Sequence, residues 1–385
     1  MILSSKMNRF GVEVFTGLDI KRKELEERGR RVYNLSIGTP DIEPPEEVRA
    51  ALNEASKEPG AWKYALYDLP EMTEAVISHY KKRFSVSLTP ELVTSCSGTQ
   101  TALLHVFLAL CDPGDTVLLP DPGYPGFLAA AYIAQVCIQY YPLVKENGFV
   151  PDLSSIPEDV AKAAKMIVVN LPSNPLGTTA PSGFYDELAE WARKYDVFVV
   201  SDNPYRDMVF DGAKGESFLE AEGATDVGIE LFSLSKTYCI TGARIGFVAG
   251  NQKAIDAVRT IREHIDFGMF IPLQRAAVAA LSLPLSYAEN ICSIYEERRD
   301  VFCGGLRSAG WDVADPKGAF FVWCPIPEGF SSSMEFCDVL LEKTGILCTP
   351  GPAFGSGGEG YVRFALVDDK EILAEAAYAI KESGL

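Results

Sequence analysis

The sequence predicts an α/β fold: a large, mixed and mostly parallel sheet domain flanked by helices, followed by a smaller α+β domain. Short apolar runs alternate with helix-like segments over residues 46–284, which is typical of a sheet covered on both faces. After about Pro284 the pattern changes to one long charged helix and a few short strands. At 385 residues the chain exceeds what one hydrophobic core usually serves, so we expect two domains.

The composition excludes several classes of partner. The net charge is -18 and no long basic run occurs, which argues against nucleic acid and anionic membranes as partners. The first residues lack the apolar core of a signal peptide, and no run reaches the roughly 18 apolar residues of a membrane span. The 9 cysteines form no CxxC pair, and no histidine lies at metal-ligand spacing. We expect a soluble cytoplasmic protein with buried reduced thiols and no metal.

The elements follow in order. Residues up to about Pro45 predict an arm with a charged helix and a first strand within VYNLSIGTPD. The segments VRAALNEASK and EMTEAVISHYKKRF have helical spacing. SGTQT then opens an apolar helix, and TVLLP predicts a strand between two turns. The first domain is therefore built from alternating helices and strands.

Four more apolar runs predict further strands buried on both faces: IAQVCIQYYPL, KMIVVN, VFVVSD and GIELFS. GFYDELAEWARKY predicts a helix between two of them. Open α/β sheets bind ligands at the carboxyl ends of their strands. Asn174, Asp202 and Lys236 each come just after such a run, so we expect the three side chains on one rim.

The second domain begins with the long helix SYAENICSIYEERRDVFCGGLRSAG. The segments FFVWCPIP, MEFCDVLLEKTG, ILCTPG and YVRFAL then predict strands and a helix. We expect residues 46–284 to form the large domain, and residues 1–45 with 285–385 to form the arm and the small domain. No low-complexity linker separates them, so they should pack closely.

Lys236 lies in LFSLSKTYCITGARIG, among small hydroxyl residues. An amine that reacts with a carbonyl must avoid ion pairs and have a lowered pKa. Ser233, Ser235 and Arg244 would suit a phosphate beside it. A solvated lysine in a polar turn is the alternative for SxSK taken alone.

Two further features suit a bound phosphate and a bound cation. Gly98, Thr99 and Gln100 open a helix, whose free amides and dipole favour an anion, although a plain helix cap is the alternative. Asp202 follows a buried strand and needs a positive partner, such as a protonated ring nitrogen. Its alternative is an Asx turn before Pro204.

Three more polar or aromatic residues lie in turns. Tyr205 either donates a hydrogen bond to the same ligand or packs, and Asn174 is either a turn residue or an amide aimed at a ligand oxygen. Tyr124 either stacks on an aromatic ligand or is half-buried. Together these residues describe a receptor for a phosphorylated aromatic aldehyde attached to Lys236. Pyridoxal 5'-phosphate meets each requirement.

In these motifs, and over nearly its whole length, the chain resembles the class I/II aminotransferases of the fold-type I pyridoxal-phosphate enzymes. It is similar to the aspartate and LL-diaminopimelate aminotransferases. The resemblance implies transfer of an amino group between an L-amino acid and a 2-oxo acid by a ping-pong mechanism, with Lys236 forming the internal aldimine. It implies that Asp202 keeps the ring nitrogen protonated, that Tyr205 and Asn174 bind the ring oxygen, and that Tyr124 stacks on the ring.

The resemblance also assigns roles outside the ring. The phosphate would be held by Gly98, Thr99, Gln100, Ser233, Ser235 and Arg244. Tyr64, in WKYALYDLP, would reach the phosphate of a neighbouring subunit, which implies a homodimer with shared active sites. Arg363 would bind the substrate α-carboxylate with its planar fork, and Gly38 belongs to a loop that closes over the substrate. A surface arginine at a strand edge is the alternative for Arg363.

One segment departs from the family. HIDFGMF (264–270) stands where LL-diaminopimelate enzymes read NVDSG, with Phe267 in place of serine. Phe267, Met269 and Phe270 favour a substrate with an uncharged or aromatic side chain. The amino acid, the 2-oxo acid and the residue that recognises the substrate side chain stay open.

Two other functions stay open beside transamination. A pyridoxal-phosphate-dependent carbon-sulfur β-lyase would share the same cofactor residues. A non-catalytic pyridoxal-phosphate sensor domain is the other, although the segment before the sheet is too short for a winged helix.

Overall fold

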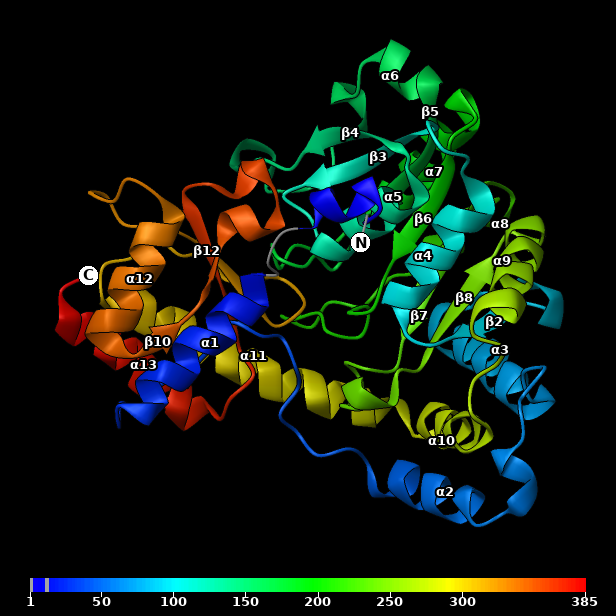
Figure 1. Cartoon of the computed structure of the whole chain (residues 1–385), viewed down its shortest axis with the longest axis horizontal. Helices are drawn as coiled ribbons and strands as arrows, with labels where there is room; N and C mark the ends of the chain where they lie inside the picture. The colour runs from blue at the N-terminus through cyan, green and yellow to red at the C-terminus, as the bar shows by residue number, and fades with distance from the viewer. Residues whose placement is uncertain (1–2, 11–13) are drawn as a thin grey trace.

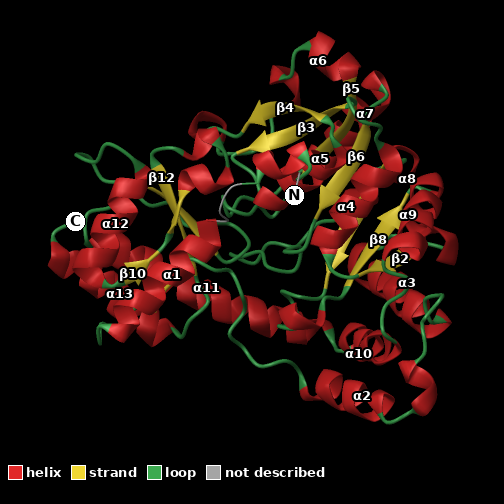
Figure 2. Cartoon of the chain, viewed as in Figure 1, coloured by secondary structure: helices red, strands yellow, loops and turns green. Residues whose placement is uncertain are grey.

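Seven strands form the main sheet of the computed structural model, which describes residues 3–10 and 14–385 (Figures 1 and 2). Their spatial order is β2-β8-β7-β6-β5-β3-β4. The five strands from β7 to β4 run parallel, whereas β8 is antiparallel to both β7 and β2. The predicted mixed, mostly parallel sheet is confirmed. The strands are β2 (Val93–Cys96), β3 (Thr116–Asp121), β4 (Cys137–Pro142), β5 (Ala164–Val169), β6 (Phe198–Asp202), β7 (Gly228–Ser233) and β8 (Gly246–Gly250).

Helices cover both faces of this sheet. In β5, Ile167 and Val169 join one apolar core and Met166 and Val168 join another, because alternate side chains of a strand point to opposite faces. The first core is completed by helices α3, α7 and α10, and the second by α4, α5 and α9. These helices are α3 (Pro70–Phe84), α4 (Thr99–Leu110), α5 (Pro125–Ala134), α7 (Phe184–Tyr195), α9 (Gln252–Ile265) and α10 (Ile271–Ser282).

Strand β4 departs from the expectation that every predicted run is buried on both faces. Four of its six residues are exposed, and only Tyr141 is buried. It lies at an edge of the sheet that the described helices leave open, whereas helices α3, α4 and α9 pack on β2 at the other edge and bury it.

The last hundred residues form an α+β arrangement (Figure 1, yellow to red). Its apolar core also includes Leu35, Tyr205, Met208, Phe210 and Cys239 from earlier in the chain. Strands β9 (Phe321–Pro325), β11 (Thr349–Pro350) and β12 (Tyr361–Ala365) form an antiparallel sheet. Their core is completed by helices α11 (Leu285–Ser308), α12 (Ser333–Thr344) and α13 (Lys370–Ser383).

The N-terminal segment packs on this C-terminal part. Strand β1 (Tyr33–Asn34) pairs with β10 (Ile346–Leu347), and α1 (Val14–Glu27) lies against the same region through Leu18 and Leu25. Residues 1–2 and 11–13 of the predicted arm lie outside the described residues. The remaining helices are α2 (Glu46–Ser56), which packs on α10, α6 (Glu158–Ala163) and α8 (Ala224–Val227).

All nine cysteines are free, and only Cys137 among them is exposed, so the prediction of buried thiols holds for the other eight. In the part of the chain that the structure describes, no single helix is long and apolar enough to cross a membrane. Helices α10 and α11 meet that test only as a pair, which is bent by 84°.

Candidate active site

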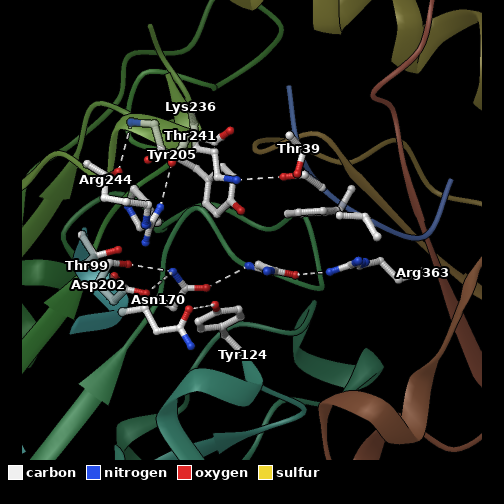
Figure 3. Close-up of a pocket in the computed structure, with 18 residues that line it drawn as sticks. Thr39, Thr99, Tyr124, Asn170, Asp202, Tyr205, Lys236, Thr241, Arg244 and Arg363 are labelled. Atoms are coloured by element: carbon white, nitrogen blue, oxygen red, sulfur yellow. Dashed lines mark hydrogen bonds between the residues drawn. The ribbon is translucent and has the colours of Figure 1, made fainter. Parts of the chain in front are cut away.

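A pocket of about 280 Å³ opens at the carboxyl ends of β5, β6 and β7, facing β9 and β12 (Figure 3). It brings together the turns that follow three parallel strands. The sequence-predicted residues that line it are Gly38, Thr99, Gln100, Tyr124, Asn174, Asp202, Tyr205, Ser233, Ser235, Lys236, Arg244 and Arg363.

Lys236 comes from the turn after β7, and its Nζ donates to the Gly38 carbonyl at 2.8 Å. Burial, together with the positive charges of Arg363 and Arg244, lowers the pKa of Lys236 to about 8. An ordinary lysine has a pKa near 10.4, so the neutral amine is far more populated here at physiological pH. The alternative of a solvated lysine in a polar turn is wrong, since burial lowers the pKa of this amine and the amine donates to a carbonyl 198 positions away.

Asp202 ends β6 as a buried carboxylate, and no ion pair joins it to another of the described residues. Asn170 Nδ2 donates to the Asp202 carbonyl at 2.7 Å, while Asp202 Oδ1 has no hydrogen-bond partner among the described residues. Burial raises the pKa of Asp202 to about 7. The Asx-turn alternative fails because the residue two positions on is Pro204, which has no amide hydrogen. A protonated ring nitrogen would supply the missing partner.

Asn170 belongs to the pocket and was missed by the sequence reasoning. Its Nδ2 donates to the backbone carbonyl of Asp202, and its Oδ1 accepts from the Asn174 backbone N–H at 2.8 Å. The sequence offered a signal for Asn170, because it is the first polar residue after the buried strand β5. Lys236 was found by the same kind of signal, since it lies three residues after the end of β7. The other lining residues that were not predicted are Ile37, Thr39, Pro204, Thr241 and Phe321.

The groups suited to a phosphate converge at the start of α4. Gly98 precedes the helix with a φ of +82°, and a Cβ there would lie 2.4 Å from Arg244 Nη2. Arg244 is held over this point by its own hydrogen bond to the Thr241 carbonyl at 2.9 Å. Ser233 Oγ accepts from the Ser235 backbone N–H at 3.1 Å, so both hydroxyls lie on one short turn. Free amides, hydroxyls and a guanidinium therefore face one anion site.

Two tyrosines flank the space between the anion site and Asp202. The Tyr124 hydroxyl donates to Gln100 Oε1 at 3.3 Å, and its ring borders the pocket. Tyr205 is buried edge-to-face against Phe320 and Phe321, and burial raises the pKa of its hydroxyl, which keeps it a hydrogen-bond donor. The pocket thus fits a planar, phosphorylated ring that carries a protonated nitrogen and an aldehyde within reach of an amine.

Arg363 enters the same pocket from β12. Its Nη1 donates to Asn174 Oδ1 at 2.9 Å, and its Nη2 donates to the carbonyl of Ser36. The guanidinium lies over the Phe321 ring at 4.4 Å, and burial lowers its pKa to about 10, which leaves it charged at neutral pH. With 2% of its surface exposed, it is no surface arginine.

Residues 30–380 match the family described as aminotransferase class I and II. The chain belongs to this family. As a class I/II aminotransferase it is a pyridoxal-phosphate-dependent enzyme whose substrates are amino acids and 2-oxo acids, and neither the β-lyase nor the sensor alternative is favoured.

The aminotransferase is similar to named relatives over nearly its full length. The LL-diaminopimelate aminotransferase of Dehalococcoides mccartyi is 39% identical over 97% of this chain and 96% of its own. The LL-diaminopimelate aminotransferase of Syntrophobacter fumaroxidans is 40% identical over 96% of this chain and 95% of its own. Among solved structures, apo-BacF of Bacillus subtilis has a TM-score of 0.96 with 37% identity, covering 100% of this chain and 99% of that one. The structure of a probable N-succinyldiaminopimelate aminotransferase of Thermus thermophilus has a TM-score of 0.91 with 35% identity, covering 96% of this chain and 100% of that one.

Tyr64 does not reach the pocket of its own chain. It is 80% exposed, its ring centroid lies 5.1 Å from that of Phe267, and it is not among the residues that line the pocket. Phe270 packs in the same way on Trp62, whereas Met269 is buried in the core of the aminotransferase and cannot contact a substrate. Within one chain, the HIDFGMF segment therefore does not line the site.

Proposed function

We propose that transamination takes place in the pocket that Lys236 and Asp202 both line. The observation that carries the proposal is that one pocket is lined by both Lys236, a buried amine of lowered pKa, and Asp202, a buried carboxylate whose Oδ1 has no hydrogen-bond partner among the described residues. Bound pyridoxal phosphate supplies an electron sink for the electron pair left when the substrate Cα loses its proton.

The residues around the pocket then have distinct roles. Lys236 Nζ moves the proton to and from the substrate Cα, and Asp202 holds the proton on the ring nitrogen. Tyr205 and the Nδ2 of Asn174 donate to the ring oxygen, since Asn174 Oδ1 is engaged by Arg363. Tyr124 covers one ring face. The phosphate is held by Gly98, Thr99, Gln100, Ser233, Ser235 and Arg244.

Substrate binding uses both parts of the chain. We assign the large domain to residues 46–284 and the arm and small domain to residues 1–45 and 285–385. Arg363, from the small domain, binds the α-carboxylate bidentately, while the loop around Gly38 lies over Lys236. Support comes from the hydrogen bonds of Arg363 and Lys236, which already join these regions.

The pocket wall favours a donor amino acid with an uncharged side chain. Three cationic side chains line the pocket, Lys236, Arg244 and Arg363, and the proposal assigns all three to the cofactor or to the substrate α-carboxylate. The wall near the Gly38 loop, formed by Ile37 and Phe321, is apolar. LL-diaminopimelate is a second candidate, favoured by the names of relatives at 38–40% identity. A panel of amino acids with 2-oxoglutarate and pyruvate as acceptors separates the two. A clear preference for LL-diaminopimelate or aspartate would overturn the uncharged donor.

A direct test of the reaction uses Lys236→Ala. The purified enzyme should show the absorbance of bound cofactor and lose it on addition of an amino acid, with the matching 2-oxo acid released. The variant should lose turnover while still binding pyridoxal phosphate through the phosphate site. Turnover at the wild-type rate by Lys236→Ala would refute the assignment.

We further propose a homodimer in which Tyr64 reaches the partner's phosphate site. Support comes from the aromatic and apolar side chains exposed beside it, Trp62, Leu66, Tyr67 and Phe267, which form a patch that a second copy would cover. Inactive Tyr64→Ala and Lys236→Ala chains, unfolded and refolded together, should regain activity, since a mixed dimer holds one complete site. No recovery in a confirmed mixed dimer would contradict shared sites.

A cytoplasmic location is the last part of the proposal. It is supported by the nine free cysteines, which suit a reducing compartment. Cell fractionation of the native host checks it, and recovery outside the cytoplasmic fraction would contradict it.

A further inference from the structure

A buried aspartate joins the turn after β6 to the turn after β7. Asp207 Oδ1 accepts from Arg83 Nε at 3.1 Å, and its Oδ2 accepts from the Thr237 hydroxyl, also at 3.1 Å. Asp207 lies two residues after Tyr205, and Thr237 directly follows Lys236. One carboxylate therefore ties together the two turns that carry the hydroxyl and the amine of the active site.

The residue next to this aspartate, Arg206, belongs to a buried network of ion pairs and hydrogen bonds. The neighbouring Arg206 pairs with Glu230 on β7 at 3.1 Å, and its guanidinium lies 3.3 Å from the centre of the Phe232 ring. Glu230 also accepts from the Tyr80 hydroxyl at 2.8 Å and from the Ser217 hydroxyl at 3.0 Å. Two arginines, Arg83 and Arg206, thus balance two carboxylates, and each buried charge has a close partner.

Asp207 stays ionised in this setting. Burial raises its pKa, but Arg206, Arg83 and the Thr237 hydroxyl outweigh this and hold the pKa below its usual value. Burial and the nearby Arg206 lower the pKa of His79 to about 3, so the imidazole is neutral. Tyr238, which also faces Asp207, stays protonated because burial raises its pKa. An ionised carboxylate is a better acceptor than a neutral carboxyl for the hydrogen bond that the Thr237 hydroxyl donates.

We infer that Asp207, acting through Thr237, is a positioning residue that sets where Lys236 Nζ lies relative to the Tyr205 hydroxyl. The inference rests on the proposed role of Lys236. Asp207 acts by placing Lys236 and not through its own charge, because the pKa of Lys236 is set by burial, Arg363, Arg244 and Cys239. Proton transfer depends steeply on placement, because a misplacement of about 1 Å can cost about a hundredfold in rate.

The test compares Thr237→Val, which removes the hydroxyl at nearly constant volume, with Thr237→Ser, which keeps it. Ser217→Ala is the control, because it also removes a buried hydroxyl that donates to a carboxylate, Glu230, away from Lys236. It removes in addition the oxygen that accepts from the Leu219 backbone N–H, so it perturbs the fold at least as much as Thr237→Val. All three are made in the full-length holoenzyme, and their unfolding midpoints are measured alongside kcat and KM.

Thr237→Val should lower kcat on the order of tenfold, while the KM of the amino acid changes by less than about twofold because Arg363 is untouched. Thr237→Ser should restore most of the rate. Ser217→Ala should lose comparable stability with kcat near the wild-type value. Equal effects of Thr237→Val and Ser217→Ala on kcat, or no rescue by serine, would overturn the inference.

A second readout does not need turnover. In the cofactor-free protein, acetylation of Lys236 by an amine reagent is followed against pH by peptide mass spectrometry. The wild-type midpoint should lie at about 8, and in Thr237→Val it should move toward the ordinary 10.5, because a displaced lysine is less buried. An unchanged midpoint would refute the inference even if kcat fell. A wild-type enzyme that labels at about 8 but does not transaminate would instead refute the proposed function.

Discussion

Replacing Asp202 with asparagine should stabilise the cofactor-free protein and lower the kcat of the loaded enzyme, that is, the enzyme with bound pyridoxal phosphate. In the cofactor-free protein, burial raises the pKa of Asp202 from 3.8 to about 7. Each pKa unit corresponds to about 1.36 kcal/mol, so ionising this carboxylate at neutral pH costs the folded state about 4 kcal/mol. The asparagine keeps the shape of the side chain and removes that cost.

The sign of the pH dependence follows from proton binding. Between about pH 4 and pH 7 the folded protein keeps the Asp202 proton, whereas the unfolded chain releases it. The wild-type contribution to the free energy of unfolding therefore falls as pH rises through this window and is fully lost above it. Asp202→Asn should not show this fall.

The assay is urea denaturation of the cofactor-free proteins at several pH values from 4.5 to 8. The difference in unfolding free energy between Asp202→Asn and wild type should grow by about 3 kcal/mol across that range, because part of the titration of the unfolded chain lies below pH 4.5. Asp159→Asn, on the exposed surface of α6, should not show it. A difference that does not change with pH would refute the view of Asp202 as a buried carboxylate without a cation.

The loaded enzyme should respond in the opposite sense. A protonated ring nitrogen gives Asp202 its missing partner, so pyridoxal phosphate should raise the unfolding midpoint more for wild type than for Asp202→Asn. Loss of this charge interaction should lower kcat by roughly 10²–10³, the range found when one buried electrostatic contact to a reacting group is removed. A variant with wild-type kcat would show that the carboxylate has no part in the reaction.

Three other predictions follow from single contacts. Gly98→Ala should weaken pyridoxal-phosphate binding, measured by absorbance titration, because the new Cβ meets a guanidinium; Gly114→Ala has a similar positive φ, no atom within 4 Å, and should bind normally. Arg363→Lys should raise the KM of the amino acid roughly 10- to 100-fold with little change in cofactor binding, since the planar fork is lost; an unchanged KM would refute its carboxylate role. Glu230→Gln should destabilise the fold by about 3–5 kcal/mol in chemical denaturation, because it leaves Arg206 buried without a carboxylate; a loss below about 1 kcal/mol would contradict a tight pair.

Much of the fold and of the pocket could be predicted because both depend on local patterns. Buried parallel strands produce continuous apolar runs, and polar residues that follow such runs meet at one edge of the sheet. Asp202 and Lys236 were placed on one rim by this reasoning alone, and Asn170 could have been found by the same signal. The exposure of the edge strand β4 could not be predicted, because a sequence of apolar residues does not reveal whether helices will cover an edge strand, as they do β2, or leave it open.

By itself, the sequence determined that this protein is an α/β enzyme with an amine, a carboxylate and an anion site in turns after buried strands. Only the tertiary structure decided how those groups are held. Lys236 contacts a carbonyl 198 positions away, Arg363 contacts Asn174 across 189, and the Thr237 hydroxyl meets Asp207 across 30. Such pairs share no periodicity in the chain, because packing brings them together. The pKa of the lysine and of Asp202 follows from that burial.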